Sequence, residues 1–80
     1  MSNYDYPKHF HMELENNENL LGRITVFMDR EKFNVEVDIV FVEGRKIFKH
    51  VKQGYGYEDE QDAVDQGVTI LSKYLSSLKH

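Results

Sequence analysis

The sequence contains no cysteine and only one proline. Without cysteine the chain forms neither disulfide bonds nor a thiolate that could attack a substrate or bind a metal. Its apolar runs are far too short to cross a bilayer, and its first residues lack the basic and apolar regions of a signal peptide. These absences favour a cytoplasmic protein that does not bind membranes.

The chain also lacks the short motifs of common catalytic sites, such as Gly-x-Ser-x-Gly, His-Glu-x-x-His and a phosphate-binding glycine-rich loop. Gly54 and Gly56 do precede the predicted helix. The residues that follow them are acidic, however, and would repel a phosphate group. We therefore expect no enzyme activity and no cofactor.

Charge and length restrict the function further. The chain has 14 acidic and 10 basic residues, for a net charge of −4. This balance argues against a general nucleic-acid binder, whose affinity comes largely from Lys and Arg neutralising phosphates. With 80 residues it forms one small domain with a limited core.

Residues 32–42 carry the clearest pattern in the chain. Apolar side chains occupy every second position from Phe33 to Phe41, and Asn34, Glu36 and Asp38 fall between them. Side chains alternate between the faces of a strand, so this pattern predicts one apolar face and one mostly charged face. The same reasoning predicts further strands over residues 8–15, 21–29 and 46–53, with a turn over residues 16–19 and a loop over residues 54–57.

The turns between these strands set their pairing. A two-residue turn at positions 30–31 places Arg23 opposite Asp38 and keeps apolar residues opposite each other, which a slip of one residue would not do. A three-residue turn at positions 43–45 then places Asp38 opposite His50. The same turn places Phe41 opposite Ile47 and Val37 opposite Val51 on the core face. On the other face it places Val40 opposite Phe48.

Residues 59–79 follow the helical period, with apolar side chains on one broad face. Asp59 is the expected N-cap, and Gly67 indicates close approach of the helix to the sheet. The prediction is an α+β domain in the order β-β-β-β-α. A flexible lead-in over residues 1–7 precedes a four-stranded antiparallel meander, and the C-terminal helix packs on one face.

The sheet face away from the helix is the first candidate site. The predicted pairing gathers on it two aromatic residues, two valines and a histidine, namely Phe27, Val40, Val42, Phe48 and His50. So many apolar groups favour an interface over a merely open sheet face. We therefore expect a small protein-interaction module, a regulator or inhibitor of the kind phages and mobile elements encode, that binds another protein or forms a homodimer.

The start of the helix is the second candidate. Its carboxylates are Glu58, Asp59, Glu60, Asp62 and Asp65. They form either an acidic docking surface for a basic partner or a simple complement to the helix dipole that also aids solubility.

Histidines offer a third candidate. His9 and His11 lie two apart on a strand and so point the same way, as two ligands of a transition metal would. Solvent-facing polar residues are the simpler interpretation, and we expect no metal site. A small metal-binding protein stays open as an alternative.

The segment from Val42 to Leu75 resembles the second half of a double-stranded RNA-binding domain. The shared features are a glycine turn at Gly44, the loop at residues 54–57 and the small residue Gly67 in the helix. The layout is also similar to the final strands and helix of ribosome-hibernation factors. Both families have an additional helix near the N-terminus, and the RNA-binding family begins its last helix with lysines where this chain is acidic. The resemblance implies a nucleic-acid-binding alternative, for which the candidate residues are Arg45, Lys46, Lys49 and Lys52.

Overall fold

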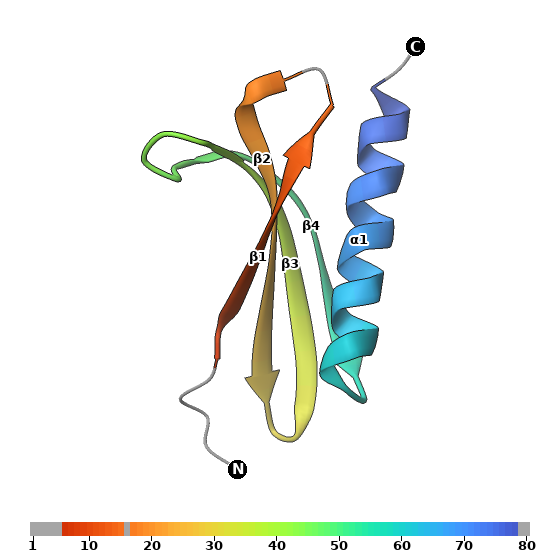
Figure 1. Cartoon of the computed structure of the whole chain (residues 1–80). Helices are drawn as coiled ribbons and strands as arrows, with labels where there is room; N and C mark the ends of the chain where they lie inside the picture. The colour runs from red at the N-terminus through yellow and green to blue at the C-terminus, as the bar shows by residue number, and fades with distance from the viewer. Residues whose placement is uncertain (1–5, 16, 79–80) are drawn as a thin grey trace.

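The computed structural model describes residues 6–15 and 17–78. Four strands come first: β1 (Lys8–Leu14), β2 (Asn17–Asp29), β3 (Lys32–Phe41) and β4 (Ile47–Tyr57). They form one antiparallel sheet in the order β1-β2-β3-β4. The helix α1 (Glu60–Ser77) follows and packs along one face (Figure 1). The predicted α+β meander with a C-terminal helix is confirmed, while the predicted lead-in lies mostly outside the described residues.

The β2–β3 hairpin has the predicted register, with Arg23 opposite Asp38 and Asp29 opposite Lys32. Its two turn residues, Arg30 and Glu31, both have positive φ, at 51° and 69°. Two positive φ angles match the right-handed twist of the strands that such a turn joins. The alternating apolar residues and the two-residue turn therefore agree on one register.

Two strands are longer than predicted. β2 begins at Asn17, so most of the turn expected over residues 16–19 is strand. β4 continues to Tyr57 through the expected loop, and Tyr57 pairs with Phe33. Gly56 adopts φ 78° there and donates its N–H to Asn34 Oδ1 at 3.0 Å. Gly56 thus allows the strand to continue with an irregular backbone. The composition of residues 54–57 alone predicts a loop there.

The β3–β4 register agrees with the prediction only in part. Asp38 is opposite His50, as expected, but Val37 pairs with Lys52 and Val40 with Ile47. The register shifts after Val37 and again after Ile39. Each shift inserts one extra residue into β4, as a β-bulge does, so the predicted Phe41–Ile47, Val37–Val51 and Val40–Phe48 pairs are wrong.

The core lies between the sheet and α1, and its buried apolar side chains are Ile24, Val26, Val35, Val37, Ile39, Ala63, Ile70 and Leu71. Gly67 faces this core, and a methyl group there would lie 2.6 Å from Ile24 Cγ2. The predicted close approach of helix to sheet is therefore confirmed.

The helix begins as predicted, because the Asp59 carboxylate accepts the Asp62 N–H at 2.9 Å and so caps a free donor of the first turn. It ends at Ser77, before the predicted boundary, and Leu78 is its C-cap. Among the described residues, no helix has the length and apolarity needed to cross a membrane.

Candidate interaction surfaces

The five residues predicted as an interface do not form one exposed face. Val40 is fully buried between Leu21 on β2 and Ile47 on β4, and Phe27 is half-buried. Phe48 lines a hollow together with Ile39 of the core face. The β-bulges in β4 explain this correction, because the extra residue at Phe48 no longer follows the simple alternation of a strand.

An apolar surface does occur nearby, at the tip of the β3–β4 hairpin. Phe41, Val42, Ile47 and Phe48 are 40%, 42%, 56% and 55% exposed, and we call them the hairpin patch. The rings of Phe41 and Phe48 meet edge to face, with their centroids 5.4 Å apart. The tip of the hairpin bends away from α1 (Figure 1). Val42 and Phe48 belong to the predicted interface, whereas sequence reasoning assigned Phe41 and Ile47 to the core.

The base of the hairpin is tied to the rest of the sheet. Phe41 donates its N–H to the Lys46 carbonyl, and Val42 donates its N–H to the Asn19 carbonyl, each at 2.9 Å. Arg45 Nη1 donates to the Val42 carbonyl at the same distance. These bonds fix the backbone of the hairpin from which the patch projects.

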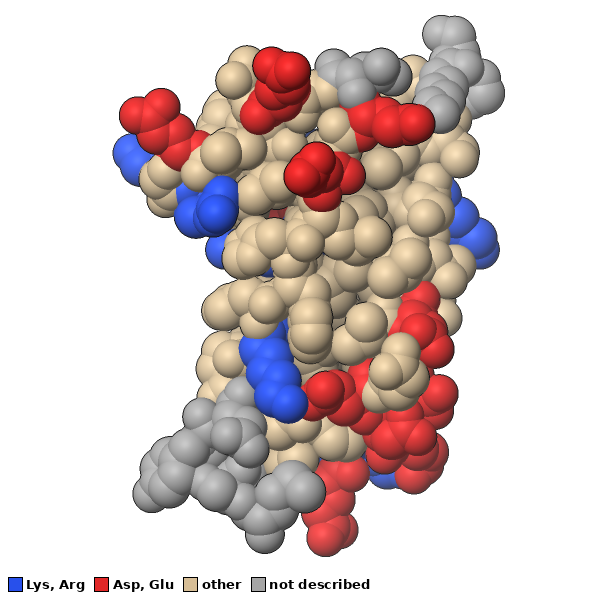
Figure 2. All heavy atoms as spheres, viewed as in Figure 1, with Lys and Arg blue, Asp and Glu red and all other residues tan. Residues whose placement is uncertain are grey.

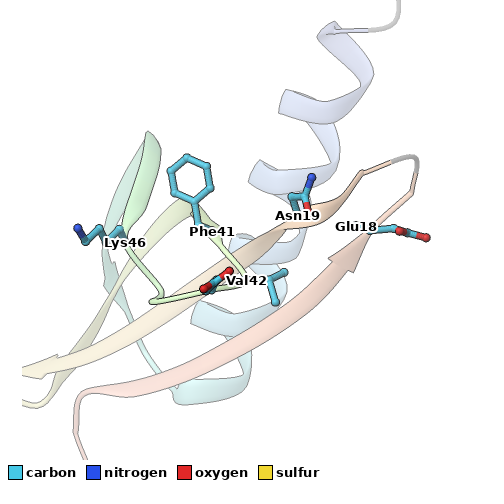
Figure 3. A pocket seen from close by; sticks show the side chains of 6 residues that line it. Glu18, Asn19, Phe41, Val42 and Lys46 are labelled. Carbon is cyan, nitrogen blue, oxygen red and sulfur yellow. The ribbon is translucent and has the colours of Figure 1, made fainter.

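A hollow of about 610 Å³ adjoins the hairpin patch. Phe41 and Val42 contribute its apolar part, while Glu18, Asn19, Glu43 and Lys46 contribute polar groups. Glu18 and Asn19 come from β2, on one side of the hollow, and Lys46, the residue just before β4, lies on the other (Figure 3). The hollow thus combines apolar side chains with charges of both signs.

A second hollow of about 160 Å³ separates the end of α1 from the sheet. It is lined mainly by apolar side chains, including Leu20, Phe48, Leu75 and Leu78. Because Phe48 belongs to both features, the apolar surface continues from the hairpin patch to the end of the helix.

The outer face, the side of the sheet away from α1, carries a different group. His11, Arg23, Asp38 and His50 lie directly opposite one another across all four strands. Asp38 is only 1% exposed, and its Oδ1 lies 2.7 Å from His50 Nδ1. Its Oδ2 lies 3.5 Å from an Arg23 nitrogen. The row therefore contains a buried carboxylate held by two basic groups.

Two atoms of this row lack a hydrogen bond among the described residues, namely Arg23 Nε and Asp38 Oδ2. Both are buried, and a buried polar atom without a partner costs about 1–3 kcal/mol. Arg23 therefore retains donor capacity beyond its contact with Asp38.

The first strand places His9 and His11 as predicted, on the outer face. His9 Nδ1 lies 3.0 Å from the Thr25 hydroxyl. Burial lowers the pKa of His11, and the positive charges of Arg45, Arg23 and His9 lower it further. Within residues 6–15 and 17–78, no group of three His, Asp or Glu side chains is placed to hold a metal ion.

Acidic side chains gather where α1 begins (Figure 2). Glu58 forms an ion pair with Lys32. Glu60 accepts hydrogen bonds from Tyr6 Oη at 2.6 Å and from Lys8 Nζ at 2.8 Å. Both bonds lower the pKa of Glu60, and the bond from Lys8 has the larger effect. Asp59 is the N-cap, and its carboxylate accepts the backbone N–H of Asp62. The Asp65 carboxylate accepts a hydrogen bond from the Gln61 side chain at 2.8 Å. Several of these groups thus have structural roles, and docking of a basic partner here stays a prediction.

The four basic candidates for nucleic-acid binding have different surroundings. Arg45 lies in the hairpin turn, and Lys46 lines the hollow beside Phe41. Lys49 is opposite Ile39, and Lys52 lines a cleft between β4 and α1. A phosphate backbone is best bound by a continuous basic stripe, which this distribution does not favour.

Comparison of the chain with protein-family models, with curated proteins and with solved structures gave no match.

Proposed function

We propose that this chain is a non-catalytic protein-interaction module and that its hairpin patch joins two copies into a homodimer. The observation that carries the proposal is the exposure of four large apolar side chains within residues 41–48. Apolar groups gathered in this way mark interaction sites more often than single exposed ones do. A cytoplasmic location, which a cysteine-free sequence favours, is part of the same proposal.

The charges around the patch support a second copy as the occupant. A two-fold axis brings the same surface of both copies together, so the surface must complement itself. Lys46 on one side of the hollow and Glu18 and Glu43 around it supply both signs. A two-fold arrangement can therefore place Lys46 of each copy against a glutamate of the other.

The size of the domain also supports this arrangement. A stable interface buries about 800 Å² on each partner, about one seventh of the 5757 Å² that this chain exposes. The hairpin patch and the adjoining apolar hollow at the end of α1 together provide a continuous surface for this purpose. Burial there would add apolar contacts that so small a core lacks.

Sedimentation equilibrium over a range of protein concentrations tests the proposal. We expect the unchanged chain to form a dimer and the double variant Phe41→Ser/Phe48→Ser to be monomeric, with the same circular dichroism spectrum. Tyr55→Ser is the matched control, because Tyr55 is an aromatic residue of β4 that is 69% exposed and lies outside the patch.

A monomer at every concentration of the unchanged chain would overturn the homodimer. So would a dimer that survives the double serine change. A dimer that Tyr55→Ser disrupts would place the interface elsewhere on β4.

A further inference from the structure

We infer that the free edge of β1 binds an extended segment of another protein in which carboxylate side chains alternate with apolar ones. The sheet has two edge strands, β1 and β4, and among the described residues β1 pairs with β2 alone. A strand added beyond β1 would lengthen the sheet, a mode of peptide recognition known as β-augmentation. This edge is separate from the hairpin patch, and the inference does not depend on the proposed homodimer.

The two edges differ in regularity. The pairing of β4 with β3 has three register shifts, and β4 also carries Lys49, Lys52 and the positive φ of Gly56. Bulges and lysines are devices by which natural edge strands avoid pairing with another chain. By contrast, β1 pairs with β2 from Lys8 to Glu13 without a shift and contains no proline. A further strand therefore fits β1 better than β4.

A backbone hydrogen bond at the far side of β2 shows which groups of β1 are free. Val42 donates its N–H to the Asn19 carbonyl, in the same register that pairs Leu20 with Phe41. Hydrogen-bonded pairs alternate along an antiparallel ladder. Odd-numbered residues of β2 therefore bond to β3, and even-numbered residues bond to β1. The partners of those even-numbered residues on β1 are Lys8, Phe10 and Met12.

The residues between these partners face the other way. His9, His11 and Glu13 therefore direct their backbone N–H and C=O groups at the free edge, where an antiparallel strand would form its hydrogen-bonded pairs. Their side chains lie on the outer face of the sheet, away from α1. The same three residues thus offer the backbone ladder and decide which side chains suit the outer face of a partner.

The inner face of β1 favours apolar side chains in the partner. The helix packs mainly on β2, β3 and β4, and its reach over β2 is marked by Gly22, where an added methyl group would lie 2.5 Å from Leu71 Cδ2. Met12 is opposite Gly22, one strand further out, and is 37% exposed. Phe10 on the same face is half-buried. Apolar side chains of an added strand would pack beside Phe10 and Met12.

The outer face of β1 favours carboxylates. His9 and His11 are exposed there, and Arg23 is opposite His11 on β2. Asp38, the next residue of the row, is 1% exposed and already lies against Arg23. Glu13 places a negative charge only near the end of the strand. Opposite charges across neighbouring strands are stabilising and like charges are destabilising, so an acidic segment complements this edge better than a basic one.

An NMR titration with a synthetic peptide tests the proposal. The probe has seven residues, the length of β1, with the sequence Val-Thr-Val-Glu-Val-Glu-Val and blocked ends. An antiparallel alignment places its threonine opposite Glu13 and its glutamates opposite His11 and His9. We expect saturable binding and slower amide hydrogen exchange at His9, His11 and Glu13. The same peptide with lysines in place of the glutamates should bind about tenfold more weakly, because two favourable pairs become unfavourable.

Proline variants separate the free edge from the ladder within the sheet. His11→Pro removes an N–H that is directed outward, a place where an edge strand tolerates proline, so we expect a folded protein that no longer binds the peptide. Met12→Pro is the matched control, because it removes an N–H directed at Gly22 and should lower the Tm. His11→Gln keeps the backbone donor and should weaken binding of the glutamate peptide by about threefold.

Absence of saturable binding would overturn the proposal, as would equal binding by His11→Pro or equal binding of the two peptides. Slower exchange at β4 amides in place of β1 amides would also overturn it. If His11→Pro lost the homodimer in sedimentation equilibrium, a second copy would be the occupant of this edge and the proposal would be wrong. The Phe41→Ser/Phe48→Ser variant should still bind the peptide, so failure here is distinguishable from failure of the proposed homodimer.

Discussion

Gly67 sets the distance between α1 and the sheet, and its replacement by alanine tests that packing. The added methyl group would lie 2.6 Å from Ile24 Cγ2 and 3.2 Å from Val35 Cγ2. Ile24 and Val35 are 0% and 1% exposed, so neither can move aside into solvent. The helix or the sheet must therefore shift to admit the methyl group.

Two opposing effects decide the magnitude. Alanine favours a helix over glycine by about 1 kcal/mol. Overpacking a well-filled core costs about 1–3 kcal/mol. The contacts at Gly67 are with rigid β-branched side chains, so we expect overpacking to win and Gly67→Ala to lower the free energy of unfolding by about 1 kcal/mol. For a domain of this size, that loss lowers the Tm by about 4–8 °C.

Thermal and urea unfolding, followed by circular dichroism at one fixed protein concentration, measure this change. Gln66→Ala is the matched control, because Gln66 is the exposed neighbour of Gly67 on the same helix. The control should change stability by no more than about 0.5 kcal/mol. A Gly67→Ala variant more stable than the unchanged chain would refute the inferred packing of α1 on Ile24 and Val35.

Three further changes test other parts of the fold. Asp59→Ala removes the N-cap and should lower the free energy of unfolding by about 1 kcal/mol in urea titrations, and an unchanged midpoint would argue against the cap. Arg23→Ala leaves the buried Asp38 carboxylate without its arginine and should cost about 2–4 kcal/mol by the same assay, whereas a loss below 1 kcal/mol would mean that the ion pair contributes little. Glu60 has a lowered pKa in the folded protein, so its contribution to stability is present above its usual pKa of 4.5 and is lost as the pH falls through the folded value. Glu60→Gln should therefore flatten the acid limb of a plot of Tm against pH, and a limb as steep as before would contradict the Lys8 contact.

How much the sequence predicts differs between the two hairpins. The β2–β3 register runs without a shift from Leu20–Phe41 to the two-residue turn that joins the strands, so the Arg23–Asp38 pair follows from counting. In β4 the extra residues at two of the register shifts are Val51 and Phe48, and neither is a glycine that would mark a bulge in the sequence. The prediction therefore finds the Asp38–His50 pair but places Phe48 on the wrong face.

The candidate sites show the same limit. Val42 and Phe48 are identified as interface residues from their apolar character, and both are exposed. Their neighbours Phe41 and Ile47 are missed, because alternation assigns them to the core and gives no sign that the hairpin bends away from α1. The place of His11 in the row opposite Arg23 could be predicted only from the register of β1 on β2. That register depends on β2 beginning at Asn17, which the sequence does not indicate.

NMR on an equal mixture of isotope-labelled and unlabelled chains tests the central claim most directly, because it detects only contacts between different copies. The proposed homodimer predicts intermolecular contacts from the rings of Phe41 and Phe48 to the hairpin patch of the other copy, lost in the Phe41→Ser/Phe48→Ser variant. Intermolecular contacts confined to β1 or to the acidic start of α1, or none at millimolar concentration, would contradict it.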